Sequence, residues 1–313
     1  MPVPEPVEES SFFLFSLPKA GSTLLMHVMA DVCKLLNIPT VDLPTKVFSL
    51  GIQPGELTED INSLWQSRGY AYVGFRSFLP PTDFDFSTTK NILLVRDPRD
   101  MLVSLYFSMK YSHVVPDVEE GEHPIRKQRA VLNNTDINQA VLNMAHAYRK
   151  YFKDYLEHLP TKTTRVYRYE DVVFKKKEWI EDMLDFLGLT LPASKISAIA
   201  DKYDIRPDRE DPQKHVRQVT PGNYKSHLSK ATVEKLDDLF GPIMHYFYYD
   251  SVISLKLGGN VKDSGVQYPA RTLLMQDAHV QRLERDLTAL RQSWSWRLSL
   301  PVRLIGSLFM DKK

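Results

Sequence analysis

The chain has 313 residues, of which 43% are hydrophobic and 25% charged, a composition typical of globular proteins rather than of disordered chains. Its 40 Lys and Arg residues balance 39 Asp and Glu residues to a net charge of +1. A protein that mainly coats nucleic acid would be far more basic, so nucleic acid is set aside as a partner. The single cysteine, Cys33, cannot form an internal disulfide, and we interpret it as a buried thiol in a reducing compartment.

The N-terminal residues 1–11 are acidic and rich in proline, which predicts a flexible tail. They lack the basic start and the apolar run of a secretory signal. No window of the chain approaches eighteen consecutive apolar residues, so no membrane-spanning helix is expected. We therefore expect a cytoplasmic protein.

Short apolar runs typical of buried strands occur at four places: 12–16, 70–75, 91–95 and 165–168. Helical signals alternate with them, from Ser22 to before Pro39, from Pro98, over 137–158, around 179–187 with Gly188 as a C-cap, and over 229–249 with an interruption near Gly241-Pro242. This alternation predicts a three-layer α/β fold with a mostly parallel central sheet, in one domain over residues 12–250.

The first strand and helix are joined by a short loop, residues 17–21 (LPKAG). Gly21 allows the backbone to approach a ligand closely, and the N–H groups of Gly21, Ser22 and Thr23 would face an anion at the N-terminus of the helix. The Walker pattern is absent, because Lys19 precedes the glycine instead of following it. The alternative is an ordinary strand-to-helix turn with a surface lysine.

A second candidate anion site follows the strand at 91–95. Arg96 stands at the carboxyl end of this strand, where open α/β sheets bind ligands. Ser104 is eight residues further, about two helical turns, so that both side chains can face one phosphate. The alternative is that the charges from Arg96 to Asp100 form a self-paired cluster at the start of the helix.

These segments resemble motifs of the PAPS-dependent sulfotransferases, where PAPS is 3′-phosphoadenosine 5′-phosphosulfate. Residues 17–25 (LPKAGSTLL) resemble the 5′-phosphosulfate loop, and 96–107 (RDPRDMLVSLYF) resemble the 3′-phosphate motif. Residues 169–171 (YED) and 217–225 (RQVTPGNYK) are similar to two later motifs, and all four occur in family order. The resemblance implies a strand–phosphate loop–helix opening, PAPS as cofactor, adenosine 3′,5′-bisphosphate (PAP) as product, and no metal.

The resemblance also implies roles for residues at matching positions. The 5′-phosphosulfate would be held by Lys19, Ala20, Gly21, Ser22, Thr23 and Leu24. The 3′-phosphate would be held by Arg96, Ser104 and Arg217, while Gly222 belongs to the segment that closes over the cofactor and Tyr169 approaches the adenine. Lys19 would also be catalytic, because its charge would stabilise the leaving phosphate oxygen.

The chain departs from the family pattern at several positions. Gln218 replaces a lysine, Tyr224 replaces a tryptophan, and Phe78 stands where the small-molecule enzymes carry a catalytic histidine. Arg76 matches a nearby lysine and could contact the sulfuryl group. Branches acting on carbohydrate or tyrosine use a glutamate placed after the first helix, so the general base stays open among three candidates: Asp42, Glu56 and His113.

The predicted function is transfer of a sulfuryl group from PAPS to an acceptor hydroxyl. The preferred acceptor is a carbohydrate, such as a polysaccharide or lipid-linked glycan in a bacterium, because the histidine is missing. One alternative is a nucleotide or sugar kinase with a related phosphate loop. The other is an inactive scaffold that binds PAPS or PAP without turnover.

Beyond the predicted domain, residues 251–271 have the composition of a linker and residues 272–313 that of a helical tail. Val280, Leu283, Leu287 and Leu290 have the spacing of a short coiled coil, which favours a homo-oligomer. Residues 293–309 (SWSWRLSLPVRLIGSLF) combine aromatic, basic and apolar side chains, which suits peripheral contact with the cytoplasmic face of a membrane. The alternative is a tail that packs back on the domain.

Overall fold

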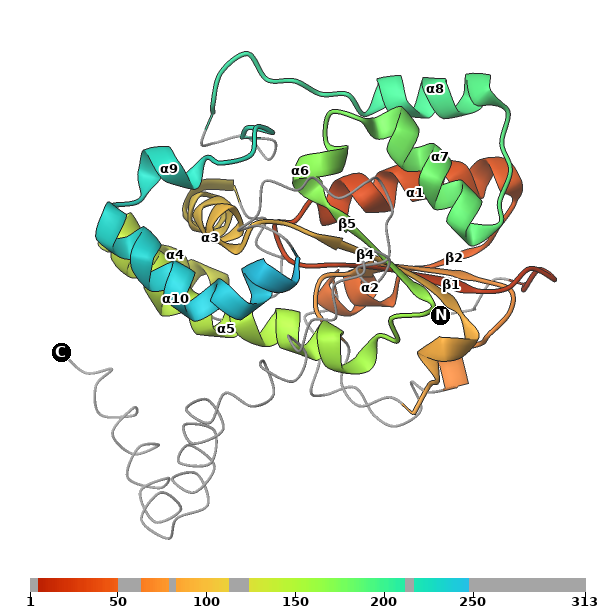
Figure 1. Ribbon diagram of the computed structural model, residues 1–313, viewed down its shortest axis with the longest axis horizontal. Coiled ribbons are helices and arrows are strands. Elements are labelled where there is room, and N and C mark those ends of the chain that lie inside the picture. The colour runs from red at the N-terminus through yellow and green to blue at the C-terminus, as the bar shows by residue number, and fades with distance from the viewer. Residues whose placement is uncertain (1–4, 50–62, 79–82, 113–123, 212–216, 248–313) are drawn as a thin grey trace, which may run out of the picture. The chain divides into compact units, whose positions relative to one another are not determined.

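Five parallel strands form the centre of the protein in the computed structural model, which describes residues 5–49, 63–78, 83–112, 124–211 and 217–247 (Figure 1). The strands are β1 (Phe12–Ser16), β2 (Thr40–Val41), β3 (Ala71–Phe75), β4 (Lys90–Val95) and β5 (Thr164–Arg168). Their order in the sheet is β2-β3-β1-β4-β5, and each neighbouring pair is parallel. The predicted α/β fold with a parallel central sheet is confirmed.

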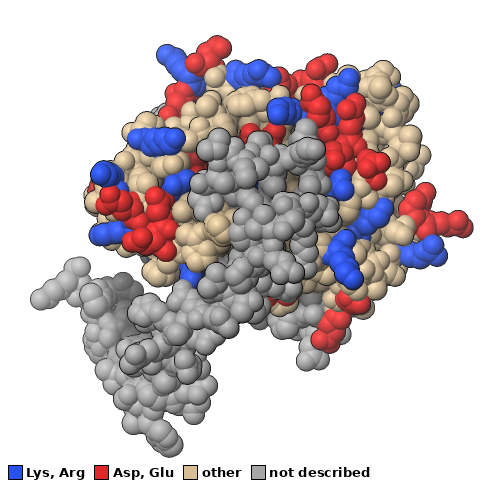
Figure 2. Space-filling model, in the orientation of Figure 1, with Lys and Arg blue, Asp and Glu red and all other residues tan. Residues whose placement is uncertain are grey.

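Helices cover both faces of the sheet. The described helices are α1 (Ser22–Leu36), α2 (Leu43–Ser49), η3 (Phe86–Thr88), α3 (Pro98–Phe107) with its π-helical extension η4 (Ser108–Ser112), α4 (Pro124–Asn133), α5 (Ile137–His158), α6 (Tyr169–Val172), α7 (Lys176–Leu187), α8 (Ala193–Lys202), α9 (Tyr224–His227) and α10 (Lys230–Tyr246). In Figure 1, α1, α7 and α8 lie on one side of the sheet, while α5 and α10 lie on the other. Within the described ranges, none of these helices is both long and apolar enough to cross a membrane. Acidic and basic side chains are interspersed over the face shown in Figure 2.

Strand β1 is buried along its whole length because it lies in the middle of the sheet. Phe12 and Leu14 join the core that contains α1, α7 and α8. Phe13 and Phe15 point to the opposite face, because side chains alternate along a strand. Phe13 stacks on Tyr72 there, with ring centroids 4.4 Å apart.

The predicted helix boundaries agree with the structure in the best-marked places. Helix α3 begins at Pro98, α5 spans residues 137–158, and Gly188 ends α7 with φ 75°. The interruption predicted near Gly241-Pro242 is wrong, because α10 continues through Pro242. Pro242 removes one helical hydrogen bond, but Leu236, Phe240 and Ile243 are fully buried along the same helix, and their packing keeps it continuous.

Part of the predicted flexible tail makes backbone hydrogen bonds to the sheet domain. Gly69 N–H donates to the Glu9 carbonyl over 2.8 Å, and Ser11 N–H donates to the Ser67 carbonyl over 2.9 Å. An antiparallel bridge between Ser10 and Arg68 completes the pairing. These backbone bonds fix residues 9–11 to the sheet domain, and sequence composition does not reveal such long-range pairing. Residues 1–4, the predicted linker 251–271 and the predicted helical tail 272–313 lie outside the described residues.

Candidate functional site

The carboxyl ends of the five parallel strands meet at one edge of the sheet, and a residue singled out in the sequence follows each of them. Asp42 comes after β2, Arg76 after β3, Lys19 after β1, Arg96 after β4 and Tyr169 after β5. The chain adds β2 and β3 on one side of β1 and then crosses to add β4 on the other. Ligands of open α/β sheets bind at such a switch point.

The loop after β1 is held in an unusual backbone conformation. Gly21 has φ 94°, and Lys19 has φ 67°, which a non-glycine residue adopts only under strain. Helix α1 then begins without a side-chain cap and without an acidic residue in its first turn. Among the described residues, the N–H groups of Gly21, Ser22 and Thr23 have no hydrogen-bond partner. The loop therefore presents backbone donors at the positive end of a helix, as an anion requires.

Several contacts hold the Arg96 side chain at this edge of the sheet. Its side chain is buried, with only 5% of the residue exposed, and its guanidinium stacks on the Tyr169 ring 4.5 Å from the centroid. It donates to the Lys19 carbonyl over 3.3 Å and to Asp100 Oδ2 over 3.4 Å. Its Nε is buried and has no hydrogen-bond partner in the described part of the chain. Arg96 is thus a fixed cation with an unused donor.

Arg217 approaches the same place from a distant segment. It stacks on the Phe107 ring at 4.4 Å, donates to Asn223 Oδ1 over 2.6 Å and forms an ion pair with Glu210. Its pKa is lowered to about 10, mainly by burial and also by the positive charge of Arg96. The two arginines are therefore close enough to repel each other.

Lys19 lies close to the same positive charges, and they affect its pKa. Its pKa is lowered to about 8, first by burial and then by Arg96, Arg76 and Arg217. Four cations from four separate segments thus converge at one edge of the sheet. Such an arrangement is unfavourable by itself and suits an anionic ligand.

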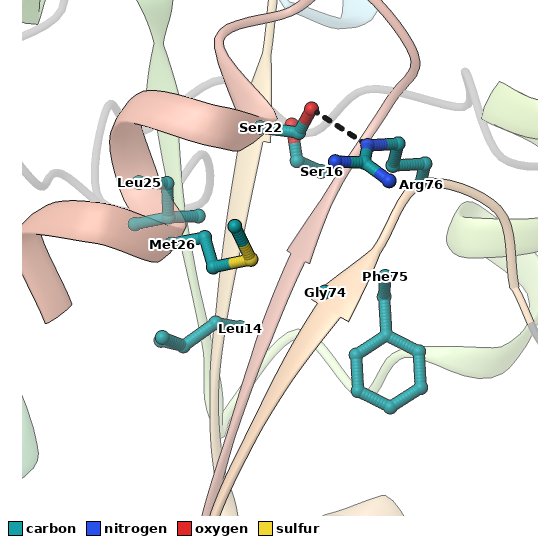
Figure 3. A pocket seen from close by; sticks show the side chains of 8 residues that line it. All are labelled: Leu14, Ser16, Ser22, Leu25, Met26, Gly74, Phe75 and Arg76. Carbon is teal, nitrogen blue, oxygen red and sulfur yellow. Dashed lines mark hydrogen bonds between the residues drawn. The ribbon is translucent and has the colours of Figure 1, made fainter. Parts of the chain in front are cut away.

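A pocket lies next to these cations, between the end of β1, the start of α1 and the end of β3 (Figure 3). Arg76 reaches across it and donates from Nε to Ser22 Oγ over 3.2 Å. Apolar side chains, including those of Leu14, Leu25 and Met26, line the rest of it. The pocket therefore combines an apolar wall with a fixed guanidinium.

Asp42 lies beside this pocket, against Gly74 in its wall. An added Cβ on Gly74 would come within 2.0 Å of Asp42 Oδ1, so only glycine permits this approach. The same oxygen accepts the Thr45 N–H over 3.0 Å and so caps α2. Of the three candidate bases, Asp42 is thus brought to the pocket, whereas Glu56 and His113 lie outside the described residues.

The structure also shows the positions of three further residues that the sequence motifs contain. Ser104 lies half-buried on α3, two turns after Arg96. Leu24 is partly buried and packs against the core that contains α1. The Phe78 ring belongs to the aromatic face of the sheet, where it stacks on His158 with centroids 4.4 Å apart and packs near Phe15.

Sequence reasoning missed several acidic and polar residues of this region. The self-pairing interpretation holds for Asp97 with Arg99, whose charged atoms are 2.6 Å apart, and for Arg96 with Asp100, at 3.4 Å. Asp100 in addition accepts hydrogen bonds from the backbone N–H groups of Gly222 and Tyr224. Glu170 accepts the Asp97 N–H over 2.9 Å, and burial raises its pKa to about 7. No sequence periodicity signals such contacts between distant segments.

The fold and this cationic edge are those of an α/β protein suited to a ligand with phosphate-like anionic groups. A family model described as the sulfotransferase domain matches residues 75–248, more than half of the chain. The chain therefore belongs to the sulfotransferase family, and the predicted membership among its PAPS-dependent enzymes is confirmed.

Three known proteins are similar to this chain. Sulfotransferase 6B1 from Danio rerio is 24% identical over 241 residues, covering 74% of this chain and 77% of the relative. A retinol dehydratase crystallised with retinol and PAP has a similar fold, with a TM-score of 0.52 and 13% identity over 80% of this chain and 84% of that chain. The mouse sulfotransferase SULT7A1, complexed with PAP, is 16% identical, with a TM-score of 0.47 over 76% of this chain and 84% of that chain. In the described segments, no group of three or more His, Cys, Asp or Glu side chains is arranged to hold a metal ion.

Proposed function

We propose that this sulfotransferase binds PAPS along the cationic edge and transfers its sulfuryl group to an acceptor hydroxyl. The convergence of Lys19, Arg76, Arg96 and Arg217 carries the proposal. PAPS has two anionic ends, and the edge has two groups of donors that fit them. The loop from Lys19 to Leu24 suits the 5′-phosphosulfate, and the arginines suit the 3′-phosphate.

The residues around the proposed 3′-phosphate site fit a doubly charged group. The buried Nε of Arg96 lacks a partner among the described residues, and a phosphate oxygen is a strong acceptor for it. We assign Ser104 and Gly222 to the same 3′-phosphate site and the Tyr169 ring to the adenine. A relative in fold, the retinol dehydratase, has PAP in its crystal structure, which supports the same ligand here.

The proposed mechanism assigns each residue one task. Bound PAPS supplies an activated sulfuryl group. Lys19 stabilises negative charge that develops on the phosphate side, as a preorganised cation in a site of low dielectric. Arg76 orients the sulfuryl oxygens, and Asp42 accepts the proton of the acceptor hydroxyl.

Binding of PAP and AMP, measured by titration calorimetry at fixed salt concentration, tests the cofactor assignment. AMP lacks the 3′-phosphate, so the wild type should bind PAP more tightly. Arg96→Ala removes charge-assisted hydrogen bonds of about 1.5–3 kcal/mol, so the preference should fall by roughly 10- to 100-fold. Arg165→Ala is the matched control, because Arg165 is a β5 arginine paired with Asp182. Equal affinity of the wild type for both nucleotides would contradict the assignment.

We propose a carbohydrate as the acceptor. A carboxylate at Asp42, rather than an imidazole at position 78, supports this choice by resemblance to the carbohydrate branch. The apolar pocket wall favours a hydrophobic alcohol as the competing acceptor, and the retinol dehydratase crystal contains retinol. Transfer of radioactive sulfate from PAPS to a panel of glycans, retinol and a steroid alcohol separates the two. Transfer of phosphate from ATP would support the kinase alternative, and PAP binding without any transfer would support the scaffold.

We also propose a cytoplasmic location, with residues 272–313 in contact with a membrane surface or a second copy of the chain. The aromatic and basic residues around Trp294 and Trp296 and the heptad spacing before them support this proposal. Flotation of the full chain with anionic vesicles, compared with a Trp294→Ala/Trp296→Ala variant, tests the membrane contact. Light scattering on the same two proteins tests self-association.

A further inference from the structure

Asp100 is a buried carboxylate that connects two segments far apart in the sequence. Only 1% of it is exposed. Asp100 Oδ2 accepts the Gly222 N–H over 2.7 Å and Asp100 Oδ1 accepts the Tyr224 N–H over 2.9 Å. Both bonds span more than 120 residues of chain. Burying a carboxylate costs free energy unless hydrogen bonds compensate for the lost water. The hydrogen bonds to Asp100 provide this compensation and fix the positions of its partners.

The two backbone bonds fix a short turn. Gly222 has φ 84°, and Tyr224 begins α9, whose cap residue Asn223 makes no side-chain capping bond of its own. Asp100 therefore caps α9 from another helix. It lies in the first turn of α3, where an acidic side chain would otherwise serve its own helix.

This turn also contacts the side chain of Arg217. Asn223 lies between Gly222 and Tyr224 in the sequence, and its Oδ1 accepts from the Arg217 guanidinium over 2.6 Å. Asp100 also accepts from Arg96 directly, at 3.4 Å. One carboxylate thus contacts Arg96 and, through the turn and Asn223, is linked to Arg217, which Glu210 and the Phe107 ring also contact.

We propose that Asp100 is the positioning residue that holds Arg96 and Arg217 together as a single 3′-phosphate site, an inference that rests on the proposed PAPS function. Two arginines repel each other and come from segments joined by no strand pairing, so their spacing needs a common anchor. Asp100 provides that anchor without touching the ligand. The residue therefore sets the preference for nucleotides that carry a 3′-phosphate.

The test compares PAP and AMP binding to Asp100→Asn, which keeps the size of the side chain but loses its charge and turns one acceptor into a donor. We expect PAP affinity to fall by roughly 10- to 100-fold, as for lost charge-assisted hydrogen bonds, while AMP affinity changes by less than about 3-fold. Asp182→Asn is the matched control, because Asp182 is also an ion-paired carboxylate, bound to Arg165 and Tyr167 away from the edge. It should lower the melting temperature and leave the ratio of the two affinities unchanged.

Asn223→Ala provides a second variant in case Asp100→Asn does not fold. It removes the hydrogen bond between Asn223 and Arg217, together with a 3.4 Å bond from Asn223 to Glu210, so it should also reduce PAP affinity selectively. The double variant should lose less than the sum of the two single losses, because both act on the same arginine. A parallel loss of PAP and AMP affinity, or an unchanged ratio in both single variants, would overturn the inference. A wild type that does not prefer PAP would instead contradict the proposed cofactor itself.

Discussion

The ring of Tyr169 lies so close to Gly21 that no side chain fits between them. A Cβ built on Gly21 would be 2.9 Å from Cδ2 of Tyr169 and 3.2 Å from Cε2. The contact joins the loop after β1 to the end of β5, and the same ring carries the Arg96 guanidinium on it. Gly21 is thus required for two reasons: it has no Cβ atom that would meet the Tyr169 ring, and it adopts a positive φ.

Gly21→Ala should destabilise the protein more than Gly222→Ala. Both glycines have positive φ, and an alanine there costs on the order of 1–3 kcal/mol. An added Cβ at Gly222 meets nothing within 4 Å, so that variant isolates the backbone term. At Gly21 the Tyr169 ring must also move. Urea unfolding of the two variants measures the difference, and equal losses would mean that the ring yields without cost.

Lys19→Ala should reduce sulfuryl transfer far more than PAP binding. The lysine is a preorganised cation, and loss of one such stabilising group costs roughly 10²–10³ in turnover. Single-turnover assays and calorimetry measure the two effects separately. Lys46→Ala, an exposed lysine on α2, is the control and should retain the wild-type rate. Near wild-type transfer by Lys19→Ala would contradict the mechanism.

Binding of PAP should take up a proton at alkaline pH. The pKa of Lys19 is lowered to about 8 in the free protein by burial and neighbouring cations, so at pH 8.5 most of the lysine is neutral. An anionic ligand raises this pKa again, and we expect uptake of roughly 0.5–0.8 proton at pH 8.5, where both phosphates of PAP are already ionised. Calorimetry in two buffers of different ionisation enthalpy measures it. Lys19→Gln should abolish the uptake, and PAP affinity of the wild type should weaken as pH rises above 8.

Asp42→Asn should stop catalysis without unfolding α2. Asparagine caps a helix nearly as well as aspartate but cannot accept the proton, so turnover should fall by about 10²–10⁴ while PAP affinity is kept. Asp136→Asn is the control, because Asp136 caps α5 in the same manner. If the Asp42→Asn variant stayed active, Glu56 and His113 would be the remaining candidates for the general base.

Glu170→Gln should change how stability depends on pH. Burial raises the folded-state pKa of Glu170 from the ordinary 4.5 to about 7. The folded state then holds a proton that the unfolded state has lost, so this group's contribution to stability falls as pH rises from 4.5 to 7 and stays low above it. The melting temperature of Glu170→Gln relative to the wild type should therefore rise by about 2–5 °C between pH 5 and pH 8. Glu178→Gln, at an exposed position on α7, should show no such trend.

Local signals in the sequence were sufficient for four of the five strands, for several helix boundaries and for several residues at the sheet edge. Strand β2 (Thr40–Val41) was not predicted, because a two-residue segment has no recognisable apolar run. Pro98 and Gly188 mark helix ends by their own backbone preferences, and Lys19 and Arg96 follow apolar runs that only a buried strand explains. The pairing of residues 9–11 with 67–69, the approach of Asp42 to Gly74 and the bonds of Asp100 to residues 222–224 depend on tertiary contacts. No pattern of neighbouring residues encodes them.

The order of strands along the edge separates two tasks. Asp42 and Arg76 follow β2 and β3 on one side of β1, whereas Arg96 and Tyr169 follow β4 and β5 on the other. Under the proposed roles, substitutions around Asp42 would alter the accepted alcohol while the nucleotide contacts proposed for Arg96 and Tyr169 stay as they are. A fold partitioned in this manner can acquire new acceptors over evolution, or by engineering, at one flank only, with the shared donor retained at the opposite flank.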